Sequence, residues 1–227
     1  MSRTAQFRFT GGAFLAAALM WWLGSMLLPV KIGTYFEAEV FAPIHEQFRL
    51  WIWIYRVQIF GMITALIAFI ALASFASESA AKVMIWPGAA VIAAGLIVGA
   101  LGEAFYYHHG AWGAKELAGK SPEEMKAFVQ ALKVDTEYVT CLVRFGRVFS
   151  GLGLVVLAWG LWLGGALPRV LVGAAALIGF AAMALTMGLP DNDAVYMPVY
   201  HAFMLWLAVT GVVIVRGGIK FADAASR

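Results

Sequence analysis

Long apolar runs separated by short polar stretches dominate the sequence, and six of them hold about 20 residues or more. A helix of that length crosses the ~30 Å hydrocarbon core of a bilayer. The pattern therefore predicts an all-α polytopic membrane protein, a single domain (1–227) built as a bundle of six transmembrane helices. The predicted spans are residues 11–30, 50–77, 84–105, 138–164, 170–189 and 196–215.

Between the third and fourth spans lies the longest polar region, residues 106–137, which we predict to be an outer loop. Within it, Ser121-Pro122-Glu123-Glu124 has the features of a helix start, with Ser as N-cap, Pro at the first helical position and Glu three residues after the cap. Apolar residues then recur at spacings of three and four, which predicts a short amphipathic extramembrane helix. They are Met125, Phe128, Val129 and Leu132.

The first apolar run can be interpreted as a signal peptide or as a membrane span. The first apolar run follows Arg3 and Arg8, as in a signal peptide, but it is longer than the ~7–15 apolar residues of such a leader and no Ala-x-Ala site follows it. We interpret it as the first span. The polar and aromatic stretch that follows, Lys31 to Arg49, predicts an amphipathic segment at the membrane interface.

Composition supports the membrane class. The chain is 63% hydrophobic and only 13% charged, whereas soluble domains are about 45–50% apolar and ~25% charged. The net charge of +3 is spread over scattered lysines and arginines without a basic stripe, which excludes nucleic acid as a partner. The single cysteine, Cys141, excludes an internal disulfide or a Cys-x-x-Cys motif, and its apolar neighbours predict a buried packing residue.

Six spans place both termini on one side of the membrane. With the termini inside, the inner segments carry mostly Arg and Lys, and the outer segments hold most of the acidic residues. The positive-inside rule then predicts cytoplasmic termini in a bacterial inner membrane.

Two arginines fall within the fourth span. Arg144 and Arg147 are three residues apart, so they share one helix face, and Arg147 is too deep for its charge to reach the interface easily. The face therefore points to protein, and Glu103, near the end of the third span, is the predicted partner of Arg147. The topology brings further polar groups to this outer level, including the turn at Asp191 and Asp193. The predicted cluster consists of Arg56, Glu103, Arg144, Arg147, Tyr200 and His201.

Four interpretations of this cluster remain open. It is an ion-pair network that fixes helix packing, a pocket for an anionic ligand, lipid headgroup or quinone, a metal or b-haem site, or part of a transport path. A transport path has the least support, because the inner half lacks matching polar residues and no inverted repeat is visible. The candidate metal or haem ligands are all the histidines of the chain: His45, His108, His109 and His201.

No hydrolase, metalloprotease or nucleotide-binding motif is present, so no sequence feature decides whether the protein is an enzyme. We favour an accessory or ligand-binding subunit of a membrane complex, such as a redox or respiratory assembly, whose partners are the lipid bilayer and other membrane subunits. The main alternative is a redox enzyme or electron carrier that binds b-haem or a metal ion through the outer histidines. A small-molecule transporter is the second alternative.

Overall fold

The computed structural model describes residues 2–28, 30, 36–76, 79–189, 193–217 and 219, and over these ranges the regular structure is entirely helical. Six helices are long and apolar enough to cross a membrane, which confirms the predicted all-α architecture. The elements are α1 (Arg3–Met26), η1 (Ala38–Val40), α2 (Phe41–Glu46), α3 (Phe48–Ser74), α4 (Lys82–Glu116), α5 (Pro122–Gly164), α6 (Arg169–Gly188) and α7 (Asp193–Val215).

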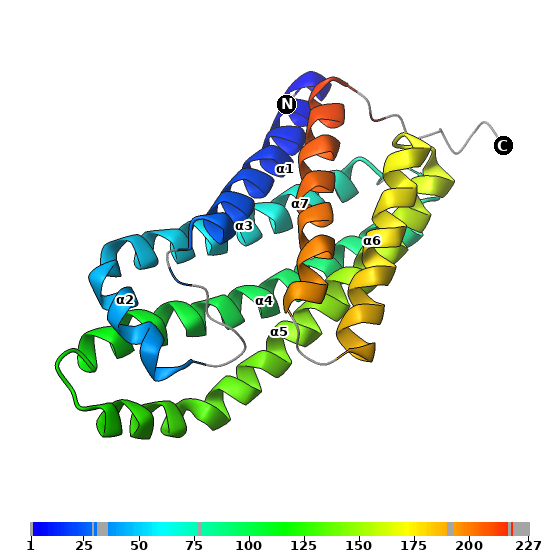
Figure 1. Ribbon diagram of the computed structural model, residues 1–227. Helices are drawn as coiled ribbons and strands as arrows, with labels where there is room; N and C mark the ends of the chain where they lie inside the picture. The colour runs from blue at the N-terminus through cyan, green and yellow to red at the C-terminus, as the bar shows by residue number, and fades with distance from the viewer. Residues whose placement is uncertain are drawn as a thin grey trace.

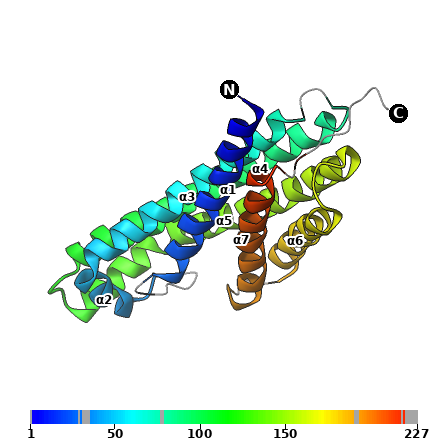
Figure 2. The same cartoon turned by 90° about the horizontal axis from the view of Figure 1, so that it is seen from above.

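The six long helices form a closed ring in the order α1, α3, α4, α5, α6, α7, and α7 packs back against α1. Figure 1 shows α1 and α7 side by side, and Figure 2 shows α3, α4 and α5 running together with α6 and α7 beside them. Side chains fill the middle of the ring: Phe69 of α3 stacks on Trp206 of α7 with their ring centroids 6.1 Å apart. Side chains thus also connect helices that are not neighbours in the ring.

The two ends of the bundle differ. We call the end that carries η1, α2 and the α4–α5 connection (117–121) the hairpin end. The opposite end, with Arg3, the α5–α6 turn (165–168) and Val215, is the terminal end (Figure 1).

Large apolar side chains point away from the bundle on every face that would meet lipid. Examples are Leu19, Phe60, Leu101 and Phe180, each at least 59% exposed. A water-soluble protein rarely exposes so many large apolar groups together. With the length of the six helices, this surface supports a multi-pass membrane protein.

Cys141 corrects one prediction. The structure places it on the exposed face of α5, between Tyr138 and Phe145, which are 67% and 52% exposed. Apolar neighbours were a poor guide to burial here, because the lipid-facing side of a membrane helix is as apolar as its packed side.

The predicted polar loop also differs from the structure. The cap at Ser121 is confirmed, with Ser121 Oγ accepting from the Glu124 N–H at 3.2 Å, but α5 then continues without a break into the fourth span. The amphipathic segment is therefore the first part of a 43-residue helix, not a separate one. On the other side of the connection, α4 extends to Glu116. At 1.5 Å per residue these helices are about 52 and 64 Å long, so their hairpin extends well beyond a ~30 Å core.

The Glu124 carboxylate stabilises the start of α5 in addition to the Ser121 cap. The Ser121 N–H donates to the Glu124 carboxylate at 2.9 Å, and this bond and the nearby Lys120 ammonium lower the pKa of Glu124 from its ordinary value. The carboxylate stabilises the helix start above its unfolded pKa, and this contribution is lost as the pH falls through the lowered value.

The segment before α3 packs on this hairpin. Phe36, Phe41 and Ile44 are buried in a small apolar cluster with residues of α3 and α4, such as Trp51 and Ala111. The predicted amphipathic character of this stretch is confirmed for residues 36–49, and it covers protein; Lys31–Tyr35 lie outside the described residues.

Glycines at heptad spacing line the seam between α4 and α5. The α4 glycines Gly88 and Gly95 face the α5 glycines Gly153 and Gly146, so that a Cβ added to Gly153 would lie 2.7 Å from the Gly88 carbonyl oxygen. Small residues at such positions let helix backbones approach closely in a membrane. The seam fixes α5, and with it the arginines of the fourth span.

Candidate functional site

A layer of polar side chains crosses the hairpin-end half of the ring. Arg147 lies 17 residues before the end of α5 and Tyr200 lies 15 residues before the end of α7. These positions are roughly 23–26 Å from the terminal end, inside a ~30 Å hydrocarbon core. Below them the bundle is closed by an apolar core that includes Phe14, Leu157 and Trp206.

Tyr200 and His201 of α7 both form hydrogen bonds with α1 within this layer. The Tyr200 hydroxyl lies 2.8 Å from Ser25 Oγ and 3.2 Å from the Trp21 carbonyl oxygen. Ser25 Oγ in turn donates to the Trp22 carbonyl at 2.8 Å, so it is free to accept from Tyr200. One residue further on, the Trp22 indole N–H donates to His201 Nδ1 at 3.1 Å.

Arg147 and Glu103 enter the layer from α5 and α4. The Arg147 guanidinium lies over the Tyr196 ring, 4.1 Å from its centroid, in a cation–π contact. Glu103 acts electrostatically on Tyr55 of α3 and on Tyr200 of α7. Arg147 thus contacts one tyrosine and Glu103 lies near two others, and the direct pairing of the two charged residues stays a prediction.

The other two predicted arginines hold structure together at the margin of this layer. Arg144 donates to the Thr186 carbonyl oxygen at 2.7 Å, which satisfies one of the last carbonyls of α6. Arg56 is exposed, donates to the Tyr107 hydroxyl at 3.1 Å and lies over Trp53, whose side chain is 62% exposed. Arg56 therefore points outward from the ring, whereas Arg147 points inward.

Four polar residues of this layer were missed in the sequence: Ser25, Tyr55, Gln58 and Tyr196. Gln58 of α3 is only 3% exposed, and its Nε2 has no hydrogen-bond acceptor within the part of the chain that the structure describes. Its side chain lies against Gly24, next to the Ser25 that accepts from Tyr200. The signal for Gln58 was a single amide inside an otherwise apolar run, between Val57 and Ile59.

The histidines lie on three elements. His45 on α2 and His108 on α4 are exposed, and His108 stacks on Trp112. His109 Nδ1 lies 3.1 Å from the Phe105 carbonyl oxygen one turn earlier. Over the described ranges, no three His, Cys, Asp or Glu side chains converge where they could hold a metal ion. Asp191 lies outside the described residues, as does the side chain of Asp193.

The hydrogen bond of His201 bears on the haem and metal interpretation. Since Nδ1 accepts the Trp22 N–H, a neutral His201 carries its own proton on Nε2. A metal-bound histidine has the opposite arrangement, in which one nitrogen binds the metal and the other donates its N–H to an acceptor. This geometry does not favour His201 as an axial or metal ligand.

We therefore expect His201→Ala to leave the visible spectrum and the metal content of the protein unchanged. The variant loses one hydrogen bond between α1 and α7, a loss of about 0.5–1.5 kcal/mol in the free energy of unfolding. A reduced-minus-oxidised spectrum with metal analysis, on wild type and variant purified gently from their own membranes, makes the comparison. A haem band or a stoichiometric metal that disappears in the variant would contradict this expectation.

No protein-family model matches the chain, and neither a curated protein nor a solved structure is significantly similar to it.

Proposed function

We propose that the protein is a ligand-binding subunit of an assembly in the bacterial inner membrane, with cytoplasmic termini. Its polar layer binds a lipid-soluble molecule whose head carries hydrogen-bond acceptor oxygens, as a quinone does. The layer comprises Ser25, Tyr55, Gln58, Glu103, Arg147, Tyr196, Tyr200 and His201.

The buried amide of Gln58 is the observation that carries this proposal. A buried donor without an acceptor costs about 1–3 kcal/mol, and native proteins rarely leave one without a reason. Gln58 Nε2 is such a donor, and the Gln58 side chain lies against Gly24, the residue before the Ser25 that accepts from Tyr200. A ligand oxygen at this position would accept its N–H.

The surrounding groups fit the head of such a ligand. The hydroxyls of Tyr55 and Tyr196 and the guanidinium of Arg147 are hydrogen-bond donors, and arginine presents a fork that suits paired oxygens. The aromatic rings of Trp21, Tyr196 and Tyr200 offer flat apolar surface. Together they match a flat, lipophilic head with carbonyl or carboxylate oxygens.

Two features favour ligand binding over a transport path or a haem or metal site. Among the described residues, the core below the layer is apolar apart from threonines such as Thr210, and it lacks the buried charged groups that would continue a transport path toward the terminal end. The geometry of His201 favours an organic ligand over haem or a metal ion.

Gln58→Leu tests the proposal. The leucine removes the unsatisfied amide, so the ligand-free variant is expected to be about 1 kcal/mol more stable than wild type. It also removes a ligand contact, so the affinity for a short-chain quinone is expected to fall about tenfold or more. Quinone-dependent shifts in melting temperature, measured on protein in lipid nanodiscs, report both quantities.

Thr210→Val is the matched control. Thr210 is fully buried and its Oγ1 also lacks a partner among the described residues, but it lies in the terminal-end half of α7. We expect it to change stability without changing quinone affinity. Equal quinone affinity in wild type and Gln58→Leu would contradict the proposal.

A further inference from the structure

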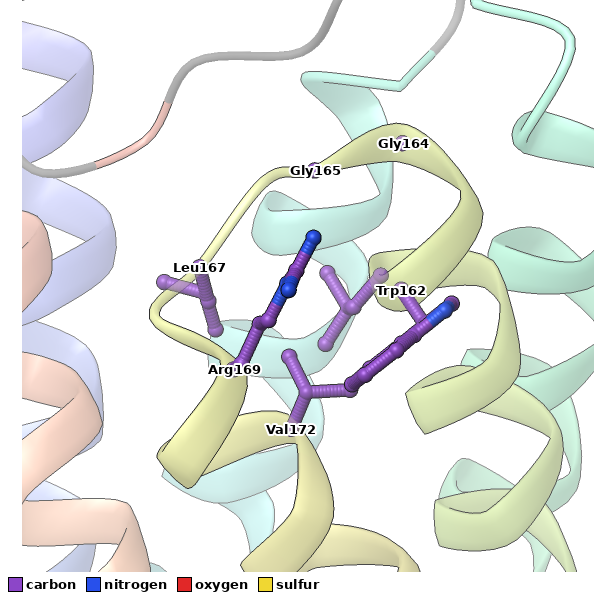
Figure 3. Close-up of a pocket in the computed structure, with 7 residues that line it drawn as sticks. Trp162, Gly164, Gly165, Leu167, Arg169 and Val172 are labelled. Carbon is purple, nitrogen blue, oxygen red and sulfur yellow. The ribbon is translucent and has the colours of Figure 1, made fainter.

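A second site lies at the opposite end of the bundle, independent of the polar layer. The α5–α6 turn encloses a cavity of about 180 Å³, and Figure 3 shows Trp162 on one side of it and the Gly164–Gly165 turn above it. At ~30 Å³ per water molecule, this volume holds about six waters. The cavity is therefore large enough for a small polar headgroup.

Arg169 supplies the charge of this cavity. It is the first residue of α6, and its guanidinium extends between Leu167 and Trp162 toward the glycine turn (Figure 3). It lies 5.4 Å from the centroid of the Trp162 ring, a cation–π contact that holds its position. No described residue accepts a hydrogen bond from the Arg169 side chain or forms an ion pair with it.

The position of the cavity in the membrane follows from the length of α6. This helix has 20 residues, about 30 Å, which matches the hydrocarbon core, so Arg169 at its start lies at headgroup level. Trp162 at the same level is typical of the interface, where indole rings meet both apolar and polar surroundings. Val170 and Leu177 are 82% and 70% exposed, and they leave an apolar path for acyl chains along α6.

The charges at the terminal end of the bundle favour an anion. In the described ranges every acidic residue belongs to the hairpin-end half, whereas Arg3, Arg8, Lys82, Arg169 and Arg216 lie toward the terminal end. An arginine fork donates two hydrogen bonds to a phosphate. We propose that the α5–α6 turn binds the phosphate of an anionic phospholipid from the leaflet at the terminal end, with Arg169 as its main ligand.

Native mass spectrometry of the detergent-solubilised full chain tests this site. Phosphatidylglycerol, phosphatidylcholine and inorganic phosphate are titrated separately against wild type, Arg169→Gln and Arg216→Gln. Wild type is expected to bind phosphatidylglycerol more tightly than phosphatidylcholine, and Arg169→Gln is expected to lose at least about tenfold in affinity for it. Arg216→Gln, an exposed basic residue of the same end that does not line the cavity, is expected to bind like wild type.

Three results would overturn the proposal. Unchanged phosphatidylglycerol binding in Arg169→Gln would show that Arg169 does not bind the lipid. An equal loss of affinity in Arg216→Gln would show that the loss follows from net charge and not from the cavity. Inorganic phosphate that displaces the lipid at similar concentration would make the site one for free phosphate. Because Arg169 is exposed, the variant is expected to fold, which its elution in size-exclusion chromatography checks.

Discussion

Gly153→Ala is expected to lower the free energy of unfolding by about 3 kcal/mol, at the upper end of the range for overpacked interiors. The new methyl would lie 2.6 Å from the Ile92 backbone nitrogen and 2.7 Å from the Gly88 carbonyl oxygen. Both neighbours are backbone atoms of α4, so neither can move aside as a side chain would. The helices must separate, and the packing along the seam between α4 and α5 is lost. Reversible denaturation in mixed micelles measures the change.

Gly173→Ala is the control for this substitution. Gly173 lies on α6, and a Cβ added there has no atom within 4 Å. Alanine is the better helix former by about 1 kcal/mol, so the variant is expected to be as stable as wild type or slightly more stable. Similar losses in the two variants would show that helix propensity, and not the close approach of α4 and α5, governs the effect.

Removing either Glu103 or Arg147 is expected to be the other strongly destabilising change. If the two form a buried pair, Glu103→Gln and Arg147→Met each leave one charge without its partner, at a cost of about 3–5 kcal/mol. The double variant is then expected to lose less than the sum of the single losses, because it leaves no charge behind. The same denaturation measurement, run as a double-mutant cycle, gives the coupling between the two side chains.

Arg56→Gln provides the reference for an arginine outside the ring. Arg56 is exposed and bonded to Tyr107, so its loss is expected to change stability by no more than about 0.5–1 kcal/mol. A negligible change in either single variant would contradict the pairing. Strictly additive losses would do the same, and would assign the effect of Arg147 to its contact with Tyr196.

Hydropathy predicted the six long apolar helices, because a span needs only enough consecutive apolar residues. It failed where helices leave the membrane. The last part of α4 and the first part of α5 are polar. A polar stretch predicts a loop unless a local feature, such as a helix cap, indicates a helix. The cap at Ser121 was such a feature, and it placed the helix start correctly.

The candidate site was predictable in part. The depth of Arg147 followed from its place in the span, and the structure brings Tyr200 and His201 into the same layer as Glu103. The sequence did not predict that Arg147 points into the ring and Arg56 points out of it. These directions depend on which helices pack together, and hydropathy does not show that. The heptad glycines of α4 and α5 are a signal for this packing, and they would have identified their seam in advance.

Native mass spectrometry on protein purified from its own membranes tests the proposed ligand site most directly. The measurement compares wild type with Gln58→Leu, with Thr210→Val as the control. A stoichiometric noncovalent adduct of a lipophilic oxygen-bearing molecule is predicted on wild type and on Thr210→Val, and it is predicted to be lost from Gln58→Leu. The absence of an adduct from wild type, or equal occupancy in all three proteins, would contradict the assignment of the polar layer as a ligand site.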